Sequence, residues 1–150
     1  MNPIATTAEA ERAIADMAAL TEQLSILLDQ ETRLVHAGKV RGAAALAPAK
    51  AELAGRLFTA SERIKASAKF LQQAVPARCL ALLRLQESFR GIVQKNMVVL
   101  ATAHAVSEGI VRRLSGQLVK KASPQVYGAN GRAVAPNPKH GRPLAVSRTL

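Results

Sequence analysis

Aromatic residues are almost absent from this chain of 150 residues, which has no tryptophan, one tyrosine and three phenylalanines. They are Phe58, Phe70, Phe89 and Tyr127. So few rings leave no platform on which nucleic-acid bases could stack. Alanine and leucine dominate instead, and both suit the packing of helices against one another. The composition therefore predicts an all-α fold.

Cysteine is nearly missing as well, because Cys79 is alone. A single cysteine excludes an internal disulfide, and we expect a small packed side chain in a reducing compartment. The first residues lack the basic start and the long apolar run of a signal peptide. No segment approaches about 18 uninterrupted apolar residues. We therefore expect a soluble, cytoplasmic protein with no transmembrane segment.

Acidic residues are scarce in the second half of the chain. Residues 1–75 hold nine Lys or Arg against eight Asp or Glu, whereas residues 76–150 hold twelve against Glu87 and Glu108 alone. Nearly all of the formal net charge of +11 therefore belongs to the second half. An acidic partner is expected to bind at this basic end.

Proline is absent between Pro76 and Pro124, and in this interval a seam recurs at alternating steps of three and four residues. Its members are Leu82, Leu85, Phe89, Ile92, Asn96, Val99, Ala103, Val106 and Ile110. This spacing predicts one long helix over 76–121. At 1.5 Å per residue the helix would be roughly 68 Å long, which is more than a compact body of this size can cover.

Two earlier helices are predicted over about 7–37 and 44–74. Gly38 would end the first, and residues 39–42 would form a turn. Pro48 would fall in the first turn of the second helix, where backbone N–H groups need no partner.

Pro76 fits the first position of the third helix, although a kink in one continuous helix is the alternative. Short connections make consecutive helices antiparallel. Residues 1–121 are therefore predicted to form a three-helix, up-down-up, coiled-coil-like bundle with an overhanging long third helix.

Residues 122–150 have a different composition, with four prolines, three glycines, no acidic residue and several Arg and Lys. Such a segment cannot bury enough apolar surface to offset the entropy of ordering it. We predict a flexible, basic, extended tail and not a second domain.

Three polar residues interrupt the apolar seams, namely Glu31, Lys50 and Asn96. Glu31 and Lys50 lie about equally far from the first turn, so antiparallel packing would pair them, and Asn96 would come within about one helical turn of Glu31. A buried pair of this kind adds little stability but fixes the register of two helices. The alternative is that Glu31 and Lys50 are half-exposed and merely solvated.

No arrangement of residues indicates catalysis. His36, His104 and His140 are scattered and have no second ligand at metal-binding spacing. His104 and Ser107 are one turn apart, but no third orienting group accompanies them. We expect neither enzyme activity nor a metal or cofactor.

An apolar stripe continues beyond the part of the third helix that the first two can cover, which ends near Val106. Its members are Ile110, Val111, Leu114, Leu118 and Val119, and the basic residues at its borders include Arg113, Lys120 and Lys121. An apolar stripe without an internal partner predicts an interaction surface. The alternative is that the helix bends and the tail covers the stripe.

Several of these elements together resemble the FlgN type of flagellar type III export chaperone. The resemblance rests on Leu27, Leu28, Glu31 and Leu34, then Leu46, Lys50 and Leu53 after a turn, Asn96 in a long helix, and the tail element Tyr127-Gly128-Ala129-Asn130-Gly131. The tyrosine-glycine element is the distinctive part, and the ending Pro143 to Arg148 agrees with it.

This resemblance implies a cytosolic, non-enzymatic chaperone. Members of the family hold the C-terminal amphipathic helix of hook-associated junction proteins and bring them to the export gate at the membrane. By the same resemblance Tyr127, with Gly128 and Gly131, would contact the cytoplasmic domain of that gate. The stripe residues and their basic neighbours would bind the client.

Two other functions remain open from the residues alone. A nucleic-acid-binding helical protein would explain the basic half, although basic residues are diluted with apolar ones and stable nucleic-acid binding is not expected. A self-associating coiled-coil adaptor, or a homodimer formed in the absence of client, would bury the stripe against a second copy.

Overall fold

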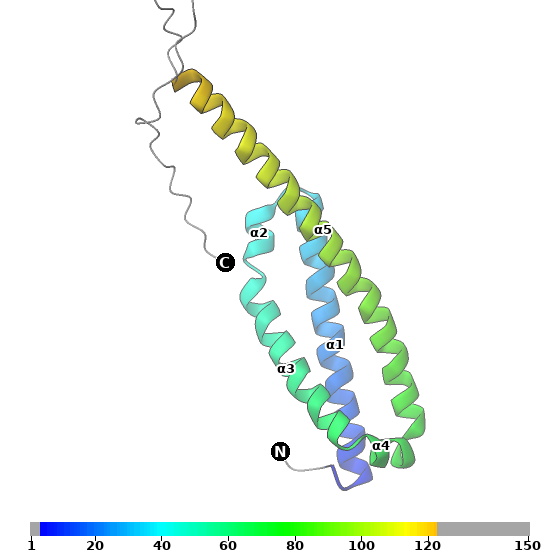
Figure 1. Cartoon of the computed structure of the whole chain (residues 1–150). Coiled ribbons are helices and arrows are strands. Elements are labelled where there is room, and N and C mark those ends of the chain that lie inside the picture. Colours follow the sequence, from blue (N-terminus) through cyan, green and yellow to red (C-terminus); the bar gives the residue numbers. More distant parts are fainter. Residues whose placement is uncertain (1–3, 123–150) are drawn as a thin grey trace, which may run out of the picture. The chain divides into compact units, whose positions relative to one another are not determined.

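The computed structural model describes residues 4–122, with side chains to residue 119. Its helices are α1 (Thr7–His36), α2 (Val40–Ala44), α3 (Ala47–Ala66), α4 (Ala68–Ala74) and α5 (Pro76–Ala122), shown in Figure 1. The described residues contain no strand, which confirms the all-α fold for this part of the chain. The tail predicted over 122–150 lies outside the described residues except for Ala122. Residues 1–106 and 107–150 form two units, which are described separately.

The start of α1 is fixed by a capping box. The Thr6 hydroxyl accepts a hydrogen bond from the Glu9 N–H at 3.2 Å, and the Glu9 carboxylate accepts one from the Thr6 N–H at 3.1 Å. The same carboxylate accepts the Ala5 N–H at 2.9 Å. The backbone N–H groups of Ala5 and then Thr6 lower the pKa of Glu9, because they stabilise its charged form.

The end of α1 is set by Gly38, whose φ of 70° lies in the left-handed region. The Gly38 N–H donates to the Val35 carbonyl at 3.0 Å, and the Lys39 N–H donates to the Leu34 carbonyl at 2.9 Å. These two bonds make up a Schellman motif, which satisfies carbonyls that the helix end would otherwise leave unpaired.

The single helix predicted over 44–74 is divided into pieces. The segment begins earlier, as α2, and residues 40–42 are helical where a turn was expected. Pro48 has no N–H to offer the carbonyl of Ala44, and its ring clashes with that carbonyl, so α2 ends there and α3 begins at Ala47 with proline in its first turn.

A second break falls at Ser67, whose φ of −115° and ψ of 18° leave the helical region. The buried Ser67 hydroxyl accepts a hydrogen bond from the Ile4 N–H at 3.1 Å. The Ser67 side chain bonds to the backbone of another segment. This hydrogen bond favours non-helical backbone angles at Ser67. Val75 then separates α4 from α5 with a φ of −142°, as expected for a residue that precedes proline.

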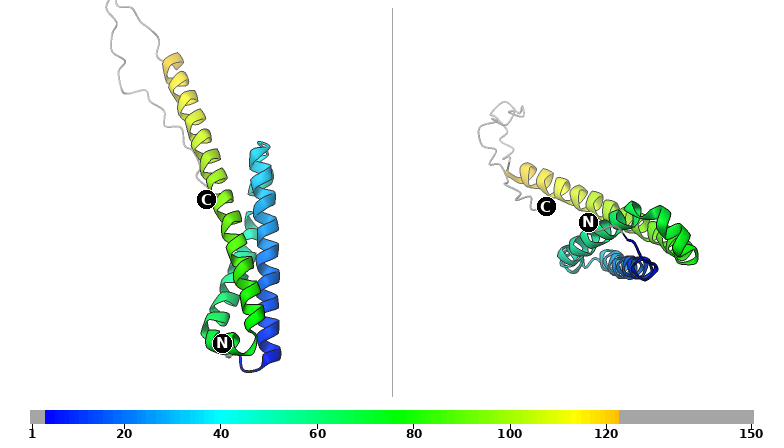
Figure 2. Two further views of the ribbon diagram at one scale, coloured as in Figure 1. Left: turned by 90° about the vertical axis from the view of Figure 1, so that its right-hand side faces the viewer. Right: turned by 90° about the horizontal axis from the view of Figure 1, so that it is seen from below.

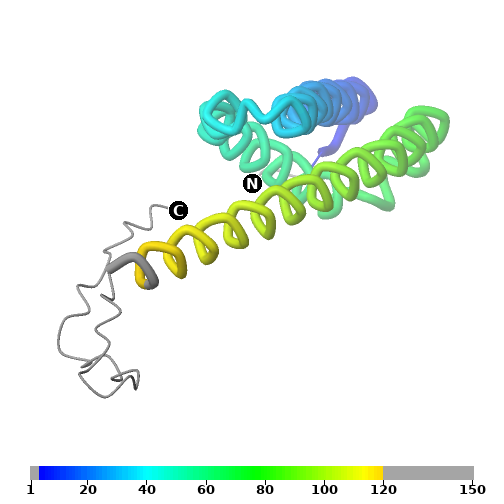
Figure 3. The backbone as a smooth tube through the Cα atoms, turned by 90° about the horizontal axis from the view of Figure 1, so that it is seen from above, coloured from blue at the N-terminus to red at the C-terminus, as the bar shows by residue number. Residues whose placement is uncertain are grey.

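Four hydrogen bonds set the direction of the helices within residues 1–106. Thr21 bonds to Gln86 and Glu31 to Asn96, so the first part of α5 runs in the same direction as α1. Glu31 bonds to Lys50 and Ile4 to Ser67, so α3 runs in the opposite direction. Figure 1 and the view from above in Figure 3 show α3 and this part of α5 beside α1.

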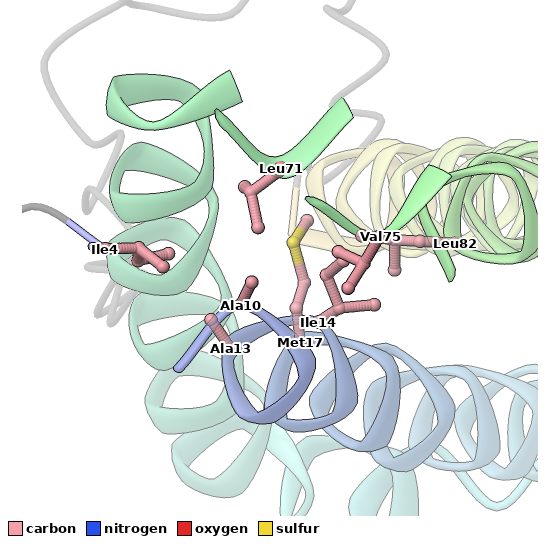
Figure 4. Close-up of a cluster of buried hydrophobic side chains, with 8 residues drawn as sticks. All are labelled: Ile4, Ala10, Ala13, Ile14, Met17, Leu71, Val75 and Leu82. Carbon is pink, nitrogen blue, oxygen red and sulfur yellow. The ribbon is translucent and has the colours of Figure 1, made fainter. Parts of the chain in front are cut away.

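The core is organised around α1, which alone contributes ten buried residues, whereas α3 contributes none. The helix α4 and the start of α5 lie beside the first turns of α1 (Figure 2), and a cluster of buried side chains gathers there (Figure 4). It consists of Ile4, Ala10, Ala13, Ile14, Met17, Leu71, Val75 and Leu82. Leu71 is 1% exposed and Ala10 is fully buried, so the centre of this cluster is closed to water.

Candidate functional site

Two features of the described residues are candidates for function, a buried polar layer and an exposed apolar stripe. The polar layer joins α1, α3 and α5 through Glu31, Lys50 and Asn96. Lys50 Nζ lies 2.6 Å from Glu31 Oε1, and Asn96 Nδ2 donates to Glu31 Oε2 at 2.9 Å. The structure therefore brings the three residues of the predicted layer together.

Burial is unequal within this layer. The Glu31 side chain is 6% exposed, whereas that of Lys50 is 30% exposed. The lysine side chain thus retains more contact with water than its carboxylate partner. This geometry reduces the desolvation cost of the lysine and leaves the carboxylate dependent on its two protein partners.

Asn96 is 3% exposed and connects α5 to two levels of α1. Besides Glu31, its amide lies 3.2 Å from both the Leu28 carbonyl and the Thr32 hydroxyl. Sliding α5 along α1 by one turn would separate the amide from all three acceptors, so Asn96 fixes the register of α5.

A second polar contact joins α1 and α5, and the sequence did not lead us to predict it. Gln86 Nε2 donates to Thr21 Oγ1 at 3.1 Å, and the fully buried Thr21 hydroxyl donates to the Met17 carbonyl at 2.8 Å. Gln86 lies four residues after Leu82 and three before Phe89, which is a seam spacing, so its position in the sequence carried the signal.

The predicted stripe is exposed in the unit that begins at Ser107. Its members are Ile110 (53% exposed), Val111 (53%), Leu114 (55%), Leu118 (57%) and Val119 (65%). Ile110, Leu114 and Leu118 recur at steps of four and lie along one face of α5. Their exposure means that water contacts more than half of each side chain, and burial against a partner would be favourable.

Charged residues accompany the stripe. Arg112 lies 3.7 Å from Glu108, and the Arg113 side chain is exposed. Lys120 and Lys121 belong to α5, but their side chains are outside the description. The proposed gate contacts Tyr127, Gly128 and Gly131 also lie outside the described residues.

Side chains that could bind a metal are dispersed over the described residues. No group of three or more His, Cys, Asp or Glu side chains in the described residues is placed to hold a metal ion. His36 ends α1, and His104 lies in α5, so the structure puts them on different helices. His140 is not described. None of the described helices is long and apolar enough to cross a membrane.

Two grooves lie within residues 1–106. One, with a volume of about 470 Å³, lies between α1 and α5 and has mainly apolar walls, including Ile14, Ala15 and Ala18 of α1 and Ala81 and Leu85 of α5. The other, of about 770 Å³, lies between α1 and α3 and is lined by many charged residues, such as Asp16, Glu52 and Arg63. The first is the better candidate for binding an apolar side chain.

Comparison of the chain with protein-family models, with curated proteins and with solved structures found no match.

Proposed function

We propose that this protein is a cytoplasmic, non-enzymatic chaperone of flagellar type III export, of the FlgN type. It would hold the C-terminal amphipathic helix of a hook-associated junction protein and deliver that client to the export gate. The observation that carries the proposal is the exposed aliphatic stripe of Ile110, Val111, Leu114, Leu118 and Val119. The sequence resemblance supplies the identity of the client.

The stripe has the chemistry that a client helix requires. Full burial of an aliphatic side chain of this size contributes about 1.5 to 3 kcal/mol, so a few such side chains can supply micromolar affinity after the cost of association. Arg112 and Arg113 add positive charge, and Lys120 and Lys121 follow in the same helix. A client helix with acidic residues beside its apolar face would therefore be preferred over a basic one.

In the proposed chaperone, an up-down-up bundle acts as the rigid support and its long third helix presents the stripe. The polar layer of Glu31, Lys50 and Asn96 supports this proposal, because it fixes the three helices in one register. The tail residues Tyr127, Gly128 and Gly131 would contact the cytoplasmic domain of the gate.

Calorimetric titration of the full chain with the purified C-terminal helical segment of a hook-associated protein tests the proposal. We expect a dissociation constant of about 10 µM or tighter, while a peptide of the same composition with its apolar periodicity scrambled does not bind. The absence of binding to the native segment, at protein concentrations where the chain is folded, would contradict the proposed client.

Because the second half of the chain is basic, nucleic-acid binding is the alternative function that has to be tested. Phosphate contacts would make binding to a duplex or a single strand fall steeply as salt increases. A chain purified after nuclease treatment should bind the client helix unchanged. Tight, salt-sensitive binding to nucleic acid, with none to the helix, would replace the chaperone with a nucleic-acid-binding protein.

A further inference from the structure

The groove between α1 and α5 and the stripe on residues 110–119 are complementary in chemistry. Apolar residues of both helices form the walls of the groove, and Ala15 and Ala81 are exposed on opposite sides of it. Alanines leave room for larger side chains from outside. The stripe offers such side chains in Ile110, Leu114 and Leu118, at the four-residue spacing of a helix that packs into a groove.

The charges at the edges of the two surfaces are also complementary. The α1 wall of the groove carries Glu11, Arg12 and Glu22, and the α5 wall carries Arg78 as its one charged residue. Neither glutamate forms an ion pair with the described residues. The groove thus has a net acidic wall on one side and a basic wall on the other.

Glu108 and Arg113 border the stripe from opposite sides. At about 100° per residue they fall on either side of the face that Ile110, Leu114 and Leu118 share. A helix that inserts this face into the groove can place Arg113 against the α1 wall and Glu108, which also lies 3.7 Å from Arg112, against the α5 wall. The reverse orientation would oppose like charges, so the charge pattern selects one direction of docking.

We propose that the stripe of one molecule packs into the α1–α5 groove of a second copy of this chain. The occupant has to come from another molecule, because Leu85 in the groove and Ile110 in the stripe are 25 residues apart on a helix that the structure shows as continuous. This self-association does not depend on the proposed chaperone function, and it would cover the stripe while no other partner is bound.

Sedimentation velocity of the full chain over a range of concentrations tests the proposal. Wild-type protein should show a concentration-dependent dimer. Ala15→Arg with Ala81→Arg fills the groove with charge, and Leu114→Asp with Leu118→Asp removes the apolar face of the stripe. Each double variant should weaken the dimer about a hundredfold. The matched control, Ala19→Arg with Ala51→Arg, places the same charges in the groove between α1 and α3 and should leave the dimer unchanged.

Mixing the two weakened variants separates this contact from other modes of pairing. The groove variant retains an intact stripe and the stripe variant retains an intact groove, so an equimolar mixture should form a heterodimer more readily than either variant pairs with itself. The proposal is overturned by a wild-type protein that stays monomeric, or by a groove variant that dimerises as well as wild type. The second result would mean that stripe pairs with stripe. Circular dichroism of each variant verifies that all are folded.

Discussion

At the scale of single residues, the polar layer shows what a sequence can specify and what it cannot. Glu31 and Lys50 are about equally distant from the centre of the predicted first turn, near residue 40 or 41, and this symmetry was sufficient to predict their contact in an antiparallel pair. Asn96 was placed within one turn of Glu31 and bonds to it directly. The unequal exposure of Glu31 and Lys50 was not predictable, because it depends on how far each helix is covered by its neighbours.

Replacing Lys50 tests whether the buried carboxylate depends on its partner. Lys50→Ala leaves Glu31 with Asn96 alone, and we expect the free energy of unfolding to fall by about 2 kcal/mol. The double change Glu31→Leu with Lys50→Leu should cost less, because no charge is left buried and the Asn96 amide keeps the Leu28 and Thr32 acceptors. Urea denaturation measures both. Equal losses in the two variants would mean that the carboxylate is not held by the lysine.

The capping carboxylate of Glu9 predicts a pH dependence of stability. Hydrogen bonds from the Ala5 and Thr6 backbone lower its pKa from 4.5 in the folded protein, so its contribution is complete above pH 4.5 and is lost as the pH falls through the folded value. We expect Glu9→Gln to melt at a lower temperature than wild type above pH 4.5 and the two to converge below it. A difference that persists unchanged to about pH 2.5 would contradict the assignment.

At the scale of helices, the ends of α1, the break between α2 and α3 at Pro48 and the start of α5 follow from local signals, whereas the break between α3 and α4 does not. Gly38 is a strong signal because few residues other than glycine adopt its positive φ, and Pro76 is one because a residue without a backbone N–H fits only the first turn of a helix. Ser67 carries no such signal, because the break between α3 and α4 at this residue coincides with a hydrogen bond from Ile4, which is 63 residues away in the sequence. Such a contact is visible only once the fold is assembled.

Two glycine substitutions should change stability in opposite directions. Gly38→Ala forces alanine into a φ of 70° and should destabilise the protein by about 1 kcal/mol. Gly55→Ala lies inside α3 and should stabilise it by about 0.5 to 1 kcal/mol, because alanine loses less entropy in a helix. No atom lies within 4 Å of an added Cβ at either site, so steric clash does not confuse the comparison. Thermal melting gives both signs, and destabilisation by Gly55→Ala would contradict the account.

At the scale of the whole molecule, the sequence predicted one exposed apolar surface, the stripe, but did not predict the other, the groove between α1 and α5. The stripe was found because its spacing continues past Val106, and each member is more than half exposed. The groove between α1 and α5 was missed, because it depends on the small size of alanines on two helices that meet only in the fold. The spacing of apolar residues along one helix predicts an apolar face on that helix. A groove is formed by two helices, so it cannot be predicted from the spacing along either one alone.

The tail tyrosine should act at a different stage from the stripe. If Tyr127 contacts the export gate, Tyr127→Ala should leave client affinity unchanged and reduce secretion of the client. Secretion and affinity are measured on the same variant, with Tyr127→Phe retaining the ring as the matched control. Loss of client binding in Tyr127→Ala would place the tyrosine in the client site and not at the gate.

The most direct test of the central claim is the affinity of Leu114→Asp with Leu118→Asp for the client helix. The variant puts two charges where a partner should bury two leucines, so each position loses about 1.5 to 3 kcal/mol of burial before any charge penalty. Leu83→Asp with Val98→Asp is the matched control, because these side chains are 66% and 54% exposed on α5 outside the stripe. We predict that calorimetry shows a loss of affinity of about a hundredfold or more in the stripe variant and an unchanged affinity in the control. The melting temperatures of both variants should be nearly unchanged. A stripe variant that binds its client at full strength, or that unfolds, would contradict the account.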